Sequence, residues 1–269
     1  MCEDTLMNHI IIMSISVILY FSATFCQIGN LNRLHQPLLY LAWGLSFIAV
    51  GLHGWLLHQW IDLPIGQNLT CLNILSTVIW LAALLTILSN LRLPVLNLGL
   101  FIFPLAAISI IAIALFPSMY ILKTAHHPKA LIHVLLSVFA FSFICIATIQ
   151  AIFVAIQEYS LRKKQTGLIQ TLLPLETMES FLFQTIAIGF ILLTLVLLTA
   201  IVFFHNIFAL YILQKTLLTI FSWLVFGILL FGRYIAGWRG KIAIRGTLLG
   251  FILLLLAYFG SKIFLATAH

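Results

Sequence analysis

Long apolar segments alternate with short polar ones along the whole chain, and this pattern predicts membrane-spanning helices. Eight segments are apolar over roughly 20 residues, the length that an α-helix needs to cross the hydrocarbon core of a bilayer. They cover residues 9–28, 37–59, 70–90, 94–116, 130–157, 181–204, 214–232 and 244–265. The short alternating segments typical of barrel strands are not seen. The pattern predicts an all-α integral membrane protein, a bundle of eight transmembrane helices.

The polar connections between these segments are short, so residues 1–269 are predicted to form a single transmembrane domain. The two longest connections are the segments 116–129 and 158–180. No internal repeat is visible, and such repeats are common in transporters. No acidic residue lies inside a predicted span, which argues against a proton-coupled carrier. Gly246 and Gly250 form a pair of small residues that should let the last helix pack closely on a neighbour.

Composition agrees with a membrane protein that has no sizeable soluble domain. The 269 residues are 63% hydrophobic and only 7% charged, whereas about 25% of the residues are charged in a soluble domain. Glu3 and Asp4, rather than basic residues, precede the first apolar segment. We therefore expect that segment to be a retained helix and not a cleaved signal peptide.

The basic residues predict the orientation of the chain in the membrane. Nine lie after odd-numbered helices, and four lie on the other side of the membrane. The nine are Arg33, Arg92, Arg162, Lys163, Lys164, Arg233, Arg239, Lys241 and Arg245, and the four are Lys123, Lys129, Lys215 and Lys262. Because the richer side faces the cytoplasm, both termini are predicted to be outside. The net charge of +7 is thus explained by topology and anionic lipid headgroups, with the lipid bilayer and no nucleic acid as a partner.

The histidines gather on the predicted outer side of the membrane. Eight of the nine belong to that side: His9, His53, His58, His126, His127, His133, His205 and His269. Imidazole is a common ligand of transition metals and of haem iron. His53 and His133 lie inside apolar segments, about 10 Å and about 6 Å below the outer ends of their helices, a placement that suits axial ligation of haem. A buried, hydrogen-bonded histidine explains either position equally well, and the single interfacial histidines are interpreted as polar anchors.

Motifs of the common enzymes are missing. The sequence holds no Ser-His-Asp arrangement, no HExxH helix and no phosphate-binding loop, so we expect no enzymatic activity. The cysteines show neither CxxC nor CxxCH spacing, so the chain is not itself a c-type cytochrome. Asp62 and Glu158 are interpreted as solvated carboxylates at helix ends, and the segment 237–241 as a tight basic turn that contacts lipid.

Four stretches of the sequence resemble the cytochrome c assembly family, which consists of haem-handling membrane proteins. The stretch GWRGKIAIRGTLLGFILLLLAYFGSKIF, residues 237–264, resembles the C-terminal signature of that family. Three further stretches agree in order: GLHGWLLHQWIDLPIGQNLTCLNILS (51–76), LIHVLLSVFAFS (131–142) and LETMESFLFQTIAIGFILLTL (175–195). The resemblance is clearest over residues 50–269.

The resemblance implies a set of haem ligands. His133 matches the first outer-face ligand, and His53 matches the first intramembrane histidine. His269 is a candidate for a second outer-face ligand. It also implies a bacterial inner-membrane protein that binds or handles haem at the outer face during cytochrome complex assembly, with haem-biosynthesis or cytochrome-maturation proteins as partners.

Two departures from the family pattern point to its shorter branch. The segment 205–215, where a tryptophan-rich haem-presenting loop is expected, contains no tryptophan. Phe231 and Gly232 stand where a further histidine is expected near the inner end of the seventh helix. Gln214 stands where the shorter branch itself has a histidine, which removes one more possible ligand. We therefore expect that the chain does not replace a true haem ligase.

Two other functions remain open at the level of the sequence. One is a non-catalytic membrane partner that regulates haem biosynthesis or stabilises another membrane protein. The other is a small-solute or metal-ion permease, which needs a continuous polar pathway, and the predicted spans look too apolar for one.

Overall fold

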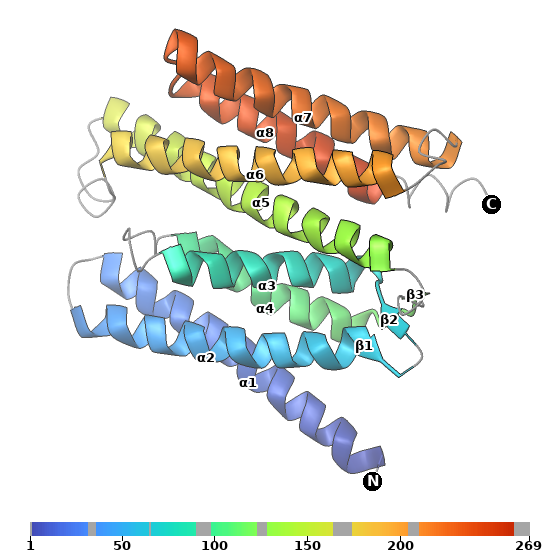
Figure 1. Cartoon of the computed structure of the whole chain (residues 1–269). Coiled ribbons are helices and arrows are strands. Elements are labelled where there is room, and N and C mark those ends of the chain that lie inside the picture. Colours follow the sequence, from blue (N-terminus) through green and yellow to red (C-terminus); the bar gives the residue numbers. More distant parts are fainter. Residues whose placement is uncertain are drawn as a thin grey trace. The chain divides into compact units, whose positions relative to one another are not determined.

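The computed structural model describes residues 2–31, 36–64, 66–89, 98–122, 128–163, 174–203 and 210–260. Within these ranges eight α-helices follow one another (Figure 1), which confirms the prediction of an all-α fold with eight helices. They are α1 (Cys2–Leu31), α2 (Gln36–Ile61), α3 (Cys71–Ser89), α4 (Gly99–Leu115), α5 (Pro128–Arg162), α6 (Leu175–Phe203), α7 (Leu210–Ala236) and α8 (Lys241–Leu255), which continues as a π-helical turn, η4 (Leu256–Gly260). Seven described helices are long and apolar enough to cross a membrane, and α4 is apolar but shorter, at 17 residues.

Helices α5 and α6 extend beyond the apolar segments that predicted them. Helix α5 continues to Arg162, and α6 begins at Leu175 rather than at residue 181. Glu176 therefore lies in the first turn of α6, where a carboxylate is favoured by the helix dipole. The expectation that no acidic residue lies inside a span is wrong for Glu179, which is buried within α6.

Residues 1–127 form one compact unit, in which four helices pack in a ring. Helix α1 packs against α2 and α4, and α3 packs against the same two helices. Tyr20 and Phe103 fill the centre of this unit, with ring centroids 5.9 Å apart. Residues 128–269 form the other compact unit. A single transmembrane domain over residues 1–269 remains a prediction.

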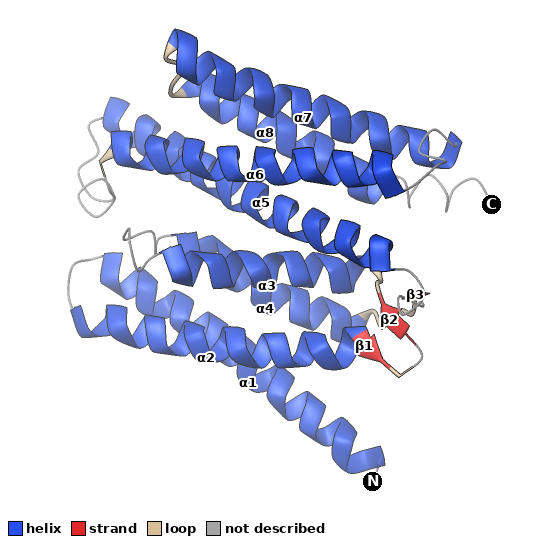
Figure 2. Cartoon of the chain, in the orientation of Figure 1, coloured by secondary structure: helices blue, strands red, loops and turns tan. Residues whose placement is uncertain are grey.

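A small antiparallel sheet lies at one end of the first unit, where α2 ends and α3 begins (Figure 2). Its strands are β1 (Asp62–Leu63), β2 (Gly66–Asn68) and β3 (Ile121–Leu122), in the order β1-β2-β3. The side chain of Asn68 stabilises the start of β3. Its Oδ1 accepts a hydrogen bond of 2.9 Å from the backbone N–H of Tyr120, the residue before β3. The sheet thus connects the ends of three helices.

In the second unit the four helices α5, α6, α7 and α8 again pack in a ring. Helix α8 approaches α7 closely at its two glycines, as predicted. A Cβ atom on Gly250 would lie 2.6 Å from the ring of Phe226, and one on Gly246 would lie 3.0 Å from Leu229. Larger residues at these positions would push the two helices apart.

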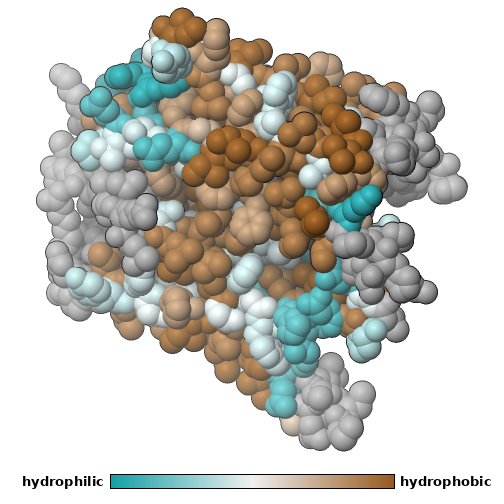
Figure 3. All heavy atoms as spheres, viewed as in Figure 1, coloured by the Kyte–Doolittle hydropathy of each residue, from teal (hydrophilic) through white to brown (hydrophobic). Residues whose placement is uncertain are grey.

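Many large hydrophobic side chains are exposed on the outside of the helices. Ile18 and Phe47 in the first unit are each 62% exposed, and Ile191 and Ile228 in the second are 60% and 58% exposed. Figure 3 shows hydrophobic side chains over much of the visible face, with hydrophilic ones gathered near the helix ends. Such a surface is stable in contact with lipid tails and not with water.

Candidate functional site

His133 is held in a tautomer that suits metal ligation. It is half-buried on α5, and its Nδ1 lies 2.9 Å from Oγ1 of Thr199 on α6. The hydroxyl of Thr199 donates its own hydrogen to the carbonyl of Val196 at 2.9 Å, so it accepts from Nδ1–H of His133. In the neutral ring the lone pair is then on Nε2, the form in which histidine binds a metal.

Cationic and aromatic side chains accompany His133 in the same unit. Lys129, one turn earlier on α5, lies over the ring of Phe203 at 5.9 Å from its centroid. Lys215 on α7 lies 5.2 Å from the centroid of the Tyr258 ring. Haem has a flat apolar body and two anionic propionates, so aromatic rings and lysines are chemically suited to it.

His53 has both ring nitrogens engaged inside the first unit. The ring is fully buried on α2, with Nδ1 3.2 Å from the Tyr20 hydroxyl and Nε2 2.9 Å from Oγ of Ser76. Ser76 in turn lies 2.9 Å from Oγ of Ser109, whose hydroxyl donates to the carbonyl of Ala106 at 2.8 Å. One chain of hydrogen bonds therefore joins α1, α2, α3 and α4.

The last hydrogen bond of this series, from Ser109 to the carbonyl of Ala106, fixes which ring nitrogen of His53 carries the hydrogen. A carbonyl only accepts, so Ser109 donates to it, and Ser76 must donate to Ser109. Ser76 therefore accepts from Nε2–H of His53, and Nδ1 accepts from the hydroxyl of Tyr20. His53 can bind a metal only if it gives up one of these two bonds.

The structure describes only some of the remaining histidines. His269, the proposed second outer-face ligand, lies outside the described residues, as do His126, His127 and His205. His9 on α1 contacts Trp55 on α2, with ring centroids 5.6 Å apart. His53 and His133 belong to different units.

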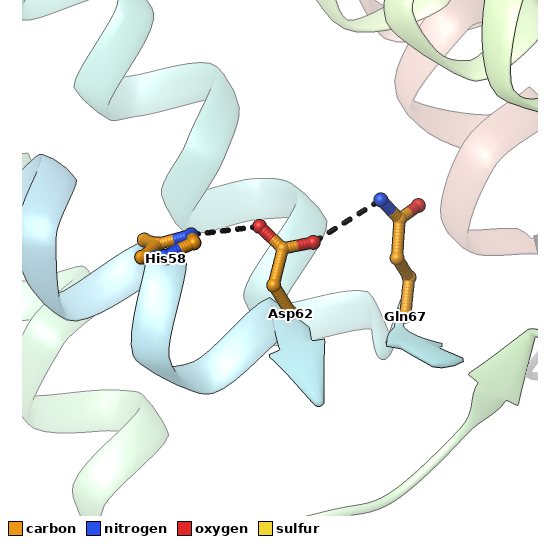
Figure 4. Close-up of polar contacts among 3 residues, drawn as sticks. All are labelled: His58, Asp62 and Gln67. Atoms are coloured by element: carbon orange, nitrogen blue, oxygen red, sulfur yellow. Dashed lines mark hydrogen bonds and ion pairs between the residues drawn. The ribbon is translucent and has the colours of Figure 1, made fainter. Parts of the chain in front are cut away.

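His58 belongs to a polar contact that the sequence analysis did not predict (Figure 4). Its Nδ1 lies 2.8 Å from Oδ2 of Asp62, one turn later at the end of α2. Gln67 on β2 donates from Nε2 to the other carboxylate oxygen of Asp62 at 3.2 Å. Asp62 and Glu158 are thus not merely solvated, since Glu158 also accepts a hydrogen bond, from Arg162 at 2.7 Å. The i,i+4 spacing of His58 and Asp62 was the feature of the sequence from which this contact could have been predicted.

Two of the stretches that carry the family resemblance meet in the second unit. The carboxylate of Glu179 on α6 accepts a hydrogen bond of 2.8 Å from the backbone N–H of Gly240, the residue before α8. Trp238 lies against Gly232, and a Cβ atom on Gly232 would collide with the Trp238 ring. The backbone carbonyl of Trp238 accepts a hydrogen bond of 3.2 Å from Arg233. Gly240 has φ +52°, which favours glycine. The tight turn is therefore built by packing inside the protein, in addition to any contact with lipid.

No group of three or more His, Cys, Asp or Glu side chains is arranged to hold a metal ion within the described ranges. Haem does not require such a group, because its iron already has four porphyrin ligands and takes one or two from the protein. His133, with Nδ1–H bonded to Thr199 and lysines and aromatic rings nearby, fits this requirement.

Comparisons with known proteins identify the family of the chain. Residues 2–269 match the family described as cytochrome C assembly protein. The chain is 34% identical over 204 residues to the inner membrane protein YpjD of Escherichia coli K12, and equally to YpjD of the O6:H1 and O157:H7 strains, which covers 74% of this chain and 75% of each relative. No solved structure matches. Together with the seven spans, these matches identify a multi-pass protein of the bacterial inner membrane. The chain belongs to the cytochrome c assembly protein family.

Proposed function

We propose that this protein binds haem near the outer face of the inner membrane, with His133 as one axial ligand. Membership of the cytochrome c assembly family supports haem handling in general. The observation that carries the more specific proposal is the hydrogen bond from Nδ1–H of His133 to Thr199, which leaves the lone pair on Nε2. When bound, haem supplies the redox chemistry of its iron, and the protein supplies ligation, orientation and exclusion of water.

The second ligand is proposed to be His269, with His53 as the other candidate. The two hydrogen bonds of His53 weigh against it, because ligation would leave either Tyr20 or Ser76 without its buried partner. The protein is proposed to be non-catalytic and to act beside cytochrome-maturation or haem-biosynthesis proteins.

Replacement of His133 tests this function. The protein, purified in detergent and supplied with haemin, should show a Soret band with sharp reduced bands. His133→Ala should lose or strongly alter these bands, because one coordination position of the iron passes to water or a substitute ligand. Thr199→Val should retain haem but shift the spectrum, since it removes the acceptor that orients the imidazole.

Ser137→Ala is the matched control. Ser137 lies one turn after His133 on the same helix and donates to its carbonyl at 2.7 Å, so its loss should leave the spectrum unchanged. An unchanged spectrum and haem content in His133→Ala would remove His133 from the site.

A further inference from the structure

We propose that the turn between α7 and α8 holds one anionic phospholipid, whose phosphate pairs with Arg239, Lys241 and Arg245. The inference goes beyond the general attraction of basic residues to a charged membrane, because it assigns one lipid to a site of fixed shape. It depends neither on haem nor on the orientation of the chain, since phospholipid phosphates lie at both faces of a bilayer.

Arg245 lies on the lipid-facing side of α8. The large apolar residues on the outside of α8 and η4, which are Ile242, Leu249, Ile252 and Leu256, are between 50% and 53% exposed. Arg245 is also exposed, and it follows Ile242 by three residues and precedes Leu249 by four, which places it on the same face of the helix. A charged side chain on such a face is costly unless it reaches water or an anionic group at the membrane interface. A lipid phosphate near the start of α8 is such a group.

Two further cations lie beside Arg245 at the start of α8. Arg239 and Lys241 directly flank Gly240, and both side chains are exposed. Lys241 and Arg245 are one helical turn apart, so their side chains are neighbours on the helix surface. Among the described residues, none of the three cations forms an ion pair with a carboxylate. Guanidinium and ammonium groups bind phosphate through charge-assisted hydrogen bonds, so the three suit one phosphate group.

The two carboxylates beside this turn are largely buried. Glu179 is 6% exposed and accepts the hydrogen bond from the N–H of Gly240. The side chain of Glu158 is 19% exposed, and its Oε2 would lie 3.5 Å from a Cβ atom on Gly240. Glu176, one turn before Glu179, is exposed, but it is a single charge against three. The exposed surface of the turn therefore carries positive charge.

Contacts within the protein fix the shape of the turn that carries these cations. The backbone N–H of Trp238 donates to the carbonyl of Gly232 at 3.2 Å, and Arg233 donates to the carbonyl of Trp238. The guanidinium of Arg233 also lies 4.7 Å from the centroid of the Phe183 ring. Because the turn is ordered before a ligand arrives, binding costs less conformational entropy than it would in a flexible basic loop.

The apolar surface next to the turn identifies a lipid rather than a free anion as the ligand. Phe231, Tyr234 and Ile235, in the last turns of α7, are 66%, 91% and 65% exposed. Hydrophilic side chains gather near the end of the second unit where α7 meets α8, and hydrophobic ones cover the helices beside it (Figures 1 and 3). A phospholipid has the same arrangement, a charged phosphate joined to apolar acyl chains, whereas inorganic phosphate and nucleic acids have no apolar part to match.

Lipid binding to the full chain in a neutral detergent tests this site. Native mass spectrometry should show one phosphatidylglycerol retained per chain under conditions that remove phosphatidylcholine with the same acyl chains. The double variant Lys241→Gln/Arg245→Gln should bind phosphatidylglycerol more weakly by roughly 10- to 30-fold. Arg33→Gln/Arg92→Gln is the matched control, because it removes two positive charges from the first unit, and its binding should equal that of the wild type.

Variants of Glu179 separate a site of fixed shape from plain attraction between charges. Attraction alone predicts tighter binding for Glu179→Ala, because a negative charge is removed. The proposed site predicts weaker binding, because the turn loses the hydrogen bond that fixes Gly240. Glu179→Gln, whose amide oxygen still accepts, should bind like the wild type. Tighter binding in Glu179→Ala would overturn the assignment, and the Lys241 and Arg245 variant decides it if Glu179→Ala does not fold.

Three other results would also overturn the inference. One is equal retention of phosphatidylglycerol and phosphatidylcholine, and another is full affinity in the double variant. The third is displacement of the lipid by inorganic phosphate or by a short RNA, which would make the turn a site for a soluble polyanion. The haem spectrum of the double variant should match the wild type, so failure here leaves the proposal for His133 untouched.

Discussion

At the scale of single residues, the hydrogen-bond partner of each histidine decides which ring nitrogen keeps its lone pair. Thr199 and Asp62 each accept a hydrogen from Nδ1 and so leave Nε2 with its lone pair, on His133 and His58 respectively. In His53 the order is reversed, because Nδ1 accepts from Tyr20 and Nε2–H donates. The three histidines therefore differ in which ring nitrogen carries the hydrogen.

Replacement of His53 should mainly destabilise the first unit. His53→Ala leaves the Tyr20 hydroxyl and Ser76 without their shared partner and opens a cavity, so we expect the free energy of unfolding to fall by about 2–4 kcal/mol. His58→Ala, at an exposed position, should stay within about 0.5 kcal/mol of the wild type. Thermal or denaturant unfolding in detergent measures both. Loss of haem from His53→Ala with unchanged stability would instead make His53 a ligand.

Most of the hydrogen-bond partners of these histidines could not be predicted from the sequence. The sequence placed His53 and His133 inside apolar segments, which singled them out correctly as unusual. Their partners lie on other helices, 23 to 66 positions away in the chain, and no local pattern reports such distant contacts. The pair His58 and Asp62 is local, but the same spacing is common in plain surface ion pairs, and the sequence analysis did not predict it.

At the scale of elements, length and apolarity predicted all eight helices, because a span must bury about 20 residues in lipid. The β strands were not predicted, since two or three residues show no alternation. The start of α6 was placed too late because its first turn is polar and the apolar run begins only at residue 181. Glu179 was misassigned to a connection for that reason, although its carboxylate is what holds the turn before α8.

Loss of the Glu179 carboxylate should loosen that turn. Glu179→Ala removes a charge-assisted hydrogen bond to the N–H of Gly240, so we expect a loss of about 1.5–3 kcal/mol in unfolding free energy. Glu179→Gln should lose less, because its amide oxygen still accepts. Glu176→Ala, an exposed carboxylate one turn earlier, is the control in the same unfolding assay. Equal stability of the variants at 176 and 179 would show that the bond contributes nothing.

At the scale of the whole molecule, the orientation in the membrane still rests on the sequence. The alternation of basic residues predicts that both termini are outside. A reporter fused after Arg162 should be cytoplasmic, and one fused after Leu122 should be on the outer side. A periplasmic signal after Arg162 would reverse the orientation and would move His133 and His58 to the cytoplasmic face.

The bond between Glu179 and Gly240 also has a consequence for synthesis. The two residues are 61 positions apart, so α6 is synthesised before the turn whose backbone N–H donates a hydrogen bond to its buried carboxylate. A nascent chain that stops in this interval carries a charge without its partner near the membrane interface. Synthesis of the segment up to Gly240 therefore supplies the partner of a carboxylate made 61 residues earlier, and a chain truncated before Gly240 leaves Glu179 without this hydrogen bond.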